Sequence, residues 1–187
     1  MSHAASPSYT PYEQYLLLEA SSDAKHEWCE GVVYAMSRGT PEHARLSAAM
    51  VRLLGTALSG ECTIYSSDAM LWIDRANLST YADATVVCGP LETKNVRKSG
   101  RSLGEAIVNP TLVVEVLSES TERYDRDGKF QAYKQLPSLK EYVLVAQDER
   151  RVEVYRLHGG EWVCETSGPG GRVSIHGQPI EVDEVYR

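Results

Sequence analysis

The chain of 187 residues lacks several features that mark whole classes of protein. No apolar run approaches the ~20 residues that a membrane-spanning helix needs. Residues 1–10 lack the basic segment and apolar stretch of a secretory signal. There is no internal repeat and no linker long enough to divide the chain. We therefore expect a cytoplasmic protein without a membrane segment, with a disordered leader over residues 1–9 and a single domain over residues 10–187.

The sequence also lacks an excess of positive charge. Its 26 acidic and 19 basic residues give a net charge of −7, which argues against tight, non-specific binding of nucleic acid over the whole surface. One local basic segment remains, with four basic residues and no acidic residue: Lys94, Arg97, Lys98 and Arg101. Such a segment is either a solvated loop or a loop that contacts phosphate groups.

Paired cysteine motifs are absent as well. The four cysteines are widely spaced and form no CxxC pair: Cys29, Cys62, Cys88 and Cys164. His26 lies near Cys29, but no second pair of ligands accompanies them. This spacing predicts neither a zinc site nor a disulfide framework, and we expect reduced thiols.

Start signals and apolar periodicity predict the helices. Thr10 and Pro11 favour a helix start, with Thr10 as the N-cap, and Thr40 and Pro41 favour a second start. An apolar stripe follows the second start at helical spacing and ends near residues 59–60: Leu46, Met50, Leu53 and Ala57. A later helix is expected to place Phe130, Tyr133 and Leu136 on one side.

Runs of apolar and β-branched residues predict the strands. Residues 26–37 have the pattern of a hairpin, and residues 89–104 that of a charged loop. The other predicted strands are 62–65, 70–73, 84–87, 111–117, 141–146, 152–157 and 161–165. This order of elements predicts an α/β protein with a central mixed β-sheet flanked by helices.

Glu115 stands out because it interrupts the apolar strand 111–117. Side chains alternate along a strand, so Glu115 shares one face with Val113 and Leu117. A buried, ionised carboxylate without a partner costs several kcal/mol, so a proton, a basic side chain or a metal ion must neutralise it. A salt bridge at the end of the sheet is the structural interpretation, and a functional carboxylate is the one we favour.

Asp83 precedes the predicted strand 84–87. Alone it is equally well explained as a turn residue. Together with Glu115 on a neighbouring strand, it would form a site with two carboxylates, which suits Mg²⁺ or Mn²⁺.

Three further side chains are candidates for the same site. Lys129 lies on the predicted surface of the following helix, where it would orient a water or stabilise phosphate charge, or simply pair with Asp125 four residues earlier. Glu27 could serve as a further metal ligand or be an exposed residue before the hairpin. His43 could be an accessory residue or a hydrogen-bonded structural histidine.

Short motifs in a fixed order link the chain to a known family. They are Asp83, Val114-Glu115-Val116-Leu117-Ser118, Ser120-Thr121, Tyr124-Asp125-Arg126, Lys129, Tyr133 and Glu141-Tyr142, preceded by His26-Glu27, Glu30-Gly31 and His43. Over about residues 10–157 the chain resembles the Uma-type family of putative restriction endonucleases, within the PD-(D/E)XK nuclease superfamily.

The resemblance implies a restriction-endonuclease-like core and an endonuclease that uses Mg²⁺ or Mn²⁺ to hydrolyse phosphodiester bonds of nucleic acid, with DNA as the expected substrate. It also implies a homodimer, because two active sites are needed to cut both strands. Asp83 and Glu115 take the positions of the metal-binding and catalytic carboxylates, and Glu27 would assist both functions.

Two positions depart from the family motif. Ala82 replaces a proline, and Leu117 replaces the motif lysine, so Lys129 resembles a relocated catalytic lysine. Because Leu117 and the acidic charge weaken the prediction of catalysis, a non-catalytic binding or assembly protein on the same fold remains the alternative.

Overall fold

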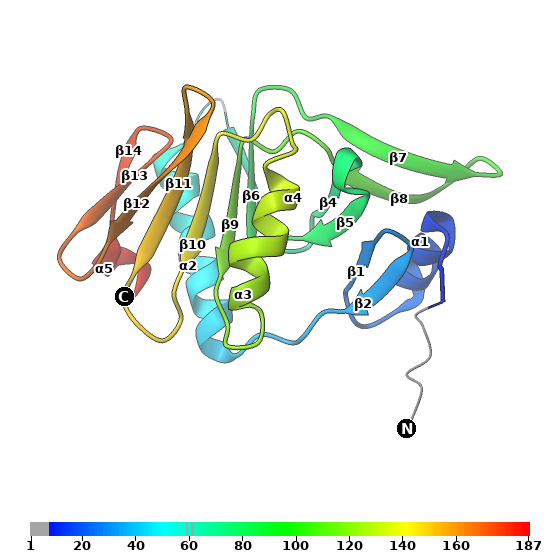
Figure 1. The fold of residues 1–187 in the computed structure, drawn as a ribbon, viewed down its shortest axis with the longest axis horizontal. Coiled ribbons are helices and arrows are strands. Elements are labelled where there is room, and N and C mark those ends of the chain that lie inside the picture. Colours follow the sequence, from blue (N-terminus) through cyan, green and yellow to red (C-terminus); the bar gives the residue numbers. More distant parts are fainter. Residues whose placement is uncertain (1–7, 59, 61) are drawn as a thin grey trace.

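The computed structural model describes residues 8–58, 60 and 62–187. The expected leader therefore lies outside the described residues, apart from Ser8 and Tyr9. The order of the elements along the chain is shown in Figure 1.

The strands form two six-stranded sheets and one two-stranded hairpin. Sheet A has the order β2-β1-β5-β4-β8-β7, which span Val32–Ala35, His26–Cys29, Leu78–Tyr81, Met70–Ile73, Arg101–Ile107 and Thr93–Lys98. Sheet B has the order β12-β11-β10-β9-β6-β3, which span Glu161–Ser167, Val152–His158, Glu141–Val145, Leu112–Val116, Ala84–Cys88 and Cys62–Ser66. The separate hairpin consists of β13 (Arg172–Ile175) and β14 (Gln178–Glu181).

Helices cover both faces of sheet B. The long helix α2 (Pro41–Ala57) lies on one face, and a second helical segment lies on the other (Figure 1). The second segment consists of α3 (Glu122–Tyr124), a π-helical turn η2 (Asp125–Lys129) and α4 (Phe130–Tyr133). The remaining helical elements are α1 (Tyr12–Ser21), the 3₁₀ turn η1 (Asp74–Ala76) and α5 (Val182–Val185).

Sheet B is mixed, because β9 runs parallel to β10 but antiparallel to β6. The predicted α/β class, with mixed sheet flanked by helices, is therefore confirmed. The strands are divided between two sheets rather than gathered in one, and Leu71 and Ile73 of sheet A pack in the same apolar cluster as Val113 and Tyr142 of sheet B.

Alternation along β9 decides which way its side chains point. Val114 and Val116 pack in the cluster that α2 covers. Val113 and Leu117 pack in the cluster that contains Phe130 of α4. Glu115 therefore faces the helical segment that contains Lys129, as the alternation predicted.

The two predicted helix starts have different outcomes. Thr40 caps α2 as predicted, because its hydroxyl oxygen accepts a hydrogen bond from the backbone N–H of His43. Thr10 does not cap α1, and Pro11 occupies the N-cap position instead. The backbone N–H of Thr10 donates to Gly31 and its carbonyl accepts from the Trp28 indole, each at 2.7 Å, so Thr10 is tied to the β1–β2 hairpin.

The prediction of a charged loop over residues 89–104 is wrong. Most of this segment forms the β7–β8 hairpin, which extends away from the body of the molecule (Figure 1). Its strands are largely solvent-exposed, so they lack the apolar alternation by which a strand is recognised. Strand β5 was also missed, because its buried centre consists of the polar residues Ser79 and Thr80.

The expectation of four reduced thiols is corrected by a disulfide between Cys62 and Cys88. The two residues lie directly opposite each other on the antiparallel strands β3 and β6. Their separation of 26 residues gives no local motif, so only strand pairing brings them together. Cys29 and Cys164 are free thiols. Within residues 8–187, apart from the undescribed positions 59 and 61, no helix is long and apolar enough to span a membrane.

Candidate active site

The register of sheet B brings Asp83 to Glu115. Ala84 pairs with Val114 in the antiparallel ladder between β6 and β9. Continuing this register by one residue places Asp83 opposite Glu115, and opposite residues of an antiparallel pair project to the same face. The Oδ2 atom of Asp83 accepts a hydrogen bond of 2.7 Å from the backbone N–H of Val116, which fixes the carboxylate beside β9.

The Glu115 carboxyl group is buried, with 4% of the residue exposed. Its Oε1 atom accepts hydrogen bonds from the Lys129 ammonium at 2.9 Å and from the Tyr133 hydroxyl at 2.8 Å. Burial raises the pKa of Glu115 to about 8, although the charge of Lys129 lowers it in part. Glu115 therefore binds a proton readily unless a further positive charge is present.

Lys129 is buried rather than on the helix surface, with 5% of the residue exposed. Its Nζ atom also lies 3.3 Å from the carbonyl oxygen of Tyr81 and 3.6 Å from Oδ1 of Asp125. Burial alone would lower the pKa of Lys129, but the neighbouring carboxylates, Glu115 foremost, outweigh it and raise the pKa. The ammonium thus contacts Asp125, as the structural interpretation expects, and it also contacts Glu115.

The π-helical turn η2 contributes Asp125 and Lys129 to the site. Single π-helical turns are rare and often occur at functional sites. A Cβ atom at Gly128 would lie 2.6 Å from the Tyr124 ring, so glycine permits this ring to pack against the turn. The Tyr124 hydroxyl donates to Oε1 of Glu27.

Glu27 is buried on β1 rather than exposed. Both of its oxygens are held, since Oε1 accepts from Tyr124 at 2.5 Å and Oε2 accepts from the Thr80 hydroxyl at 2.6 Å. Its charge acts on Lys129, whose pKa it raises. Glu27 therefore lies beside the carboxylate site, positioned by two neutral donors.

His43 lies in the first turn of α2 and reaches the same site. Its Nε2 atom is 3.3 Å from Oδ2 of Asp83. The hydrogen bond with Asp83 raises the pKa of His43, although burial opposes the shift. His43 contacts the carboxylate candidate itself, so it is part of the site as well as a hydrogen-bonded histidine.

The structure gives specific contacts to Asp125, Tyr133 and Tyr124, which the sequence named only as a partner of Lys129 or as parts of the motif, and it adds Thr80. Asp125, Lys129 and Tyr133 are spaced by four residues, and Lys129 and Tyr133 both bond Glu115. That spacing was visible in the sequence and is typical of one helix face. Thr80 and Tyr124 hold Glu27 from distant parts of the chain, and no local pattern identifies them.

The donor set of this site fits a hard divalent cation. The contacts of Glu115 fall on Oε1 and those of Asp83 on Oδ2. Among the described residues, Oε2 of Glu115 and Oδ1 of Asp83 have no hydrogen-bond partner. Mg²⁺ in proteins commonly uses one or two carboxylates and keeps several waters, so two carboxylate oxygens are the type and number of protein ligands that suit it.

The four basic residues predicted to contact nucleic acid all lie on the β7–β8 hairpin. Lys94 stacks on the Trp72 ring, with Nζ 3.4 Å from the ring centroid. Lys98 pairs with Glu13 at 3.2 Å, and Arg97 donates to the Gly100 carbonyl. The hairpin projects away from α3 and α4, so its basic residues are separated from the carboxylates (Figure 1).

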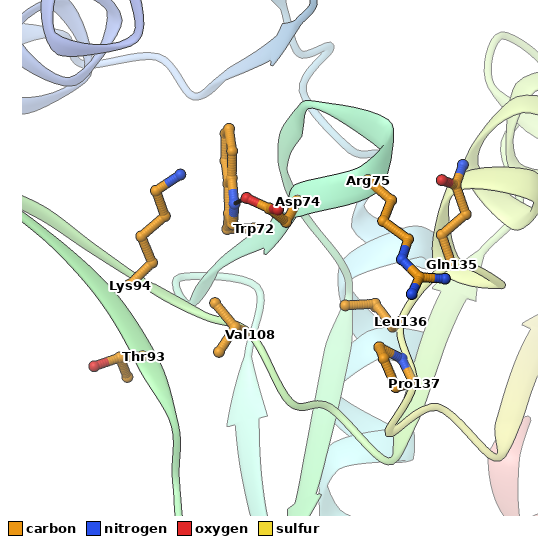
Figure 2. A pocket seen from close by; sticks show the side chains of 9 residues that line it. All are labelled: Trp72, Asp74, Arg75, Thr93, Lys94, Val108, Gln135, Leu136 and Pro137. Atoms are coloured by element: carbon orange, nitrogen blue, oxygen red, sulfur yellow. Dashed lines mark hydrogen bonds between the residues drawn. The ribbon is translucent and has the colours of Figure 1, made fainter.

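A hollow of about 490 Å³ lies between this hairpin, η1 and the segment after α4. Figure 2 shows the Arg75 side chain extending toward Gln135, with Lys94 beside Trp72. Its lining residues are Trp72, Asp74, Arg75, Thr93, Lys94, Val108, Gln135, Leu136 and Pro137. None of the carboxylate-site residues lines this hollow, so it is a separate feature of the surface.

Comparison with known proteins places the chain among restriction-endonuclease-like proteins. The model of the Uma2 family, described as "Putative restriction endonuclease", matches residues 12–182. Two uncharacterized proteins of Synechocystis sp. are similar. The protein slr1290 is 34% identical over 97% of this chain and 93% of its own length. The protein sll1609 is 32% identical over 80% of this chain and 82% of its own length.

A solved structure shows the same fold. It is the crystal structure of a putative nuclease belonging to DUF820 from Anabaena variabilis, with a TM-score of 0.70 and 15% sequence identity over 88% of this chain and 91% of that one. The family match extends over most of the described residues and includes every residue of the carboxylate site. The chain therefore belongs to the Uma2 family of putative restriction endonucleases.

Proposed function

We propose that this protein is an endonuclease that hydrolyses phosphodiester bonds of nucleic acid with the help of Mg²⁺ or Mn²⁺, and that its preferred substrate is DNA. The observation that carries the proposal is the placement of Asp83 opposite Glu115, with the Lys129 ammonium 2.9 Å from Glu115. Membership of a family with a nuclease-like fold supports it.

In this proposal the carboxylates of Asp83 and Glu115 would hold the cation. The ion would supply Lewis acidity toward a phosphate group. Val116 and His43 fix the Asp83 carboxylate, and Tyr133 fixes Glu115, so both ligands are oriented before the ion binds.

Lys129 stabilises negative charge at the reacting phosphate. Its raised pKa keeps it protonated at neutral pH, and its buried position strengthens its electrostatic effect. Glu27 assists as a third carboxylate, after Glu115 and Asp125, whose charge acts on the Lys129 ammonium, and Thr80 and Tyr124 hold it in place.

We also propose that residues 10–187 act as one domain. Leu71 of sheet A and Val113 of sheet B belong to one apolar cluster, so neither sheet has a core of its own on that side.

One observation favours the alternative of a binding or assembly protein without catalysis. The Glu115 carboxyl group already accepts hydrogen bonds from Lys129 and Tyr133, and its pKa of about 8 allows it to exist as the neutral acid without a metal. Such a closed arrangement is stable without an ion. The net charge of −7 also opposes general nucleic-acid binding.

Metal binding and cleavage separate the two functions. Calorimetric titration with Mn²⁺ should detect binding in the wild type and its loss in Asp83→Asn and Glu115→Gln. Cleavage of double-stranded DNA, single-stranded DNA and RNA should require Mg²⁺ or Mn²⁺, and each variant should lower the rate by about 10²-fold or more. Asp148→Asn, in the exposed turn between β10 and β11, is the matched control and should retain full activity.

Two results would decide against the nuclease. Binding of Mn²⁺ that is unchanged in both variants would place the ion elsewhere. Binding through Asp83 and Glu115 without cleavage of any of the three substrates would favour the non-catalytic function.

A further inference from the structure

A second group of metal-ligating side chains lies outside the carboxylate site and shares no residue with it. Cys62 at the start of β3, Cys88 at the end of β6 and His176 in the β13–β14 turn place their ligand atoms within 4.8 Å of one another. The Nε2 atom of His176 lies 3.7 Å from the Sγ atom of Cys88. Three separate segments of the chain thus converge on one point.

The fold holds these residues in place independently of any ligand. Cys62 and Cys88 are direct cross-strand partners in sheet B. His176 adopts a left-handed backbone conformation, with φ of 50°, in a tight turn. Its backbone N–H donates to Oε2 of Glu141 at 2.7 Å, and Oε1 of Glu141 is bonded to Arg156 at 2.7 Å. The His176 imidazole therefore lies on a turn whose backbone is fixed by hydrogen bonds, rather than on a free loop.

The spacing of nitrogen and sulfur matches that of ligands on one tetrahedral zinc ion. Zn–S bonds of ~2.3 Å and Zn–N bonds of ~2.0–2.1 Å at a tetrahedral angle give an S···N distance of about 3.6 Å. In the oxidised protein Sγ of Cys88 and Nε2 of His176 are already 3.7 Å apart, so on reduction this spacing needs little change, whereas the two sulfur atoms must move apart before both can bind the ion. Thiolate and imidazole ligands suit Zn²⁺, whereas Mg²⁺ prefers oxygen ligands.

We propose that Cys62, Cys88 and His176 form a redox-gated site for Zn²⁺, closed while the disulfide is present and open once it is reduced. In the oxidised protein the two sulfur atoms are bonded to each other and cannot act as thiolate ligands. A phosphine reductant opens the site by converting the disulfide, the phosphine and one water to two thiols and a phosphine oxide. Zinc binding then displaces the two thiol protons to solvent.

The reduced site offers three protein ligands and an open position. The His176 side chain is exposed, so water can reach a fourth position on the ion. The bound ion would join β3, β6 and the β13–β14 turn, whereas the disulfide joins only β3 and β6. Zinc should therefore raise the midpoint of thermal unfolding of the reduced protein by more than it raises that of the oxidised protein, in which only the carboxylate site is open to the ion.

Cobalt(II) is the probe, because cobalt bound by thiolate has a charge-transfer absorption in the near ultraviolet that carboxylate ligands do not produce. The full-length protein, reduced with a phosphine and freed of oxygen, should bind one equivalent of Co²⁺ with this absorption, and Zn²⁺ should displace it. The same protein oxidised with diamide should show no such absorption. This comparison of one sequence in two states does not depend on any variant folding correctly.

Variants identify the ligands. Cys62→Ser and Cys88→Ser should abolish the thiolate absorption. His176→Ala should weaken Co²⁺ binding by about 10-fold or more, because even the loss of a residue that only supports a metal ligand lowers the affinity by about that factor. The matched controls are Cys29→Ser, Cys164→Ser and His158→Ala, which should bind as the wild type does.

The proposal is wrong if reduced wild type shows no thiolate absorption with Co²⁺ at micromolar protein. It is also wrong if Cys29→Ser or Cys164→Ser removes the absorption. Unchanged binding in His176→Ala would overturn the assignment of the imidazole as a ligand. None of these outcomes bears on nuclease activity, so the two proposals can fail separately.

Discussion

The ammonium of Lys129 lies 2.9 Å from Oε1 of Glu115, and both side chains are almost fully buried. The lysine reaches Glu115 from the helical segment over sheet B, whereas Leu117 occupies the strand position two residues after Glu115 on the same face. Leu117 is itself buried, in the apolar cluster that contains Phe130. The helix thus supplies the positive charge that the strand lacks.

Replacing Lys129 by methionine should separate charge from packing. Methionine keeps an unbranched apolar side chain of similar length in the buried position. Without the ammonium, the pKa of Glu115 should rise further, so that this group stays protonated at pH 7, and the pKa of the neighbouring Asp125 should rise with it. We expect a loss of about 1–3 kcal/mol in the free energy of unfolding, measured with urea, and a fall of about 10²-fold or more in metal-dependent cleavage. Cleavage equal to that of wild type would show that Lys129 is only a structural partner of Glu115 and Asp125.

Leu117→Lys tests whether the position or the charge matters. In the Lys129→Met background it returns an ammonium to the strand, on the same face as Glu115. The double variant should cleave faster than Lys129→Met alone. In the wild-type background, Leu117→Lys should only destabilise, because it places a second charge in an apolar cluster. If the double variant is folded but no faster than Lys129→Met, the strand position does not support the chemistry.

The stability of the protein should depend on pH through Glu115. Its pKa is about 8 in the folded protein, against an ordinary value of 4.5. Because the folded state retains this proton and the unfolded state releases it, Glu115 should contribute stability that is full below about pH 4.5 and is lost as the pH rises through 8. The contribution should be at most about 5 kcal/mol, since one pKa unit corresponds to about 1.4 kcal/mol.

The comparison with Glu115→Gln isolates this effect. The free energy of unfolding of wild type, measured with urea at several pH values from 5 to 8, should fall relative to that of the variant. Saturating Mn²⁺ should reverse the trend in wild type, because the ion binds only the deprotonated carboxylate. Parallel curves for the two proteins would contradict the assignment.

The basic β7–β8 hairpin should contribute to nucleic-acid binding through Arg97 and Arg101. Lys94 and Lys98 are already engaged with Trp72 and Glu13, so the two arginines are the better tests. The double variant with Arg97→Gln and Arg101→Gln should weaken binding of double-stranded DNA, and each lost phosphate contact should reduce the salt dependence, d log K/d log[salt], by about 0.9.

Arg172→Gln provides the control for this change, because Arg172 is exposed on β13, far from the hairpin (Figure 1). It should bind DNA as wild type does in a fluorescence-anisotropy titration at several salt concentrations. A double variant with an unchanged salt slope would make the hairpin a solvated surface feature.

The protein should form a homodimer. The expectation comes from the family resemblance, since cutting both strands of a duplex needs two active sites. Light scattering should give twice the monomer mass of 20.7 kDa at micromolar concentration. A measured mass equal to that of one chain at micromolar concentration would show that the protein is a monomer.

Local sequence pattern predicted much of the fold. The Thr40-Pro41 start and the apolar stripe of α2 identified that helix, and Glu30-Gly31 identified the first hairpin. Alternation along residues 111–117 placed Glu115 on the face of Val113 and Leu117. The β7–β8 hairpin was missed because most of its residues are charged or polar, so little apolar alternation marks it as strand.

The sequence alone therefore predicted the α/β class and the family, and it identified Asp83 and Glu115 as candidate carboxylates, because these follow from periodicity over a few residues and from the order of short motifs. Only the tertiary structure decided that Lys129 is buried against Glu115, that Thr80 and Tyr124 hold Glu27, and that Cys62 and Cys88 meet His176. These contacts join residues far apart in the chain, 88 positions in the case of Cys88 and His176. The pairing of strands and the packing of helices fix such contacts, and neither leaves a local pattern in the sequence.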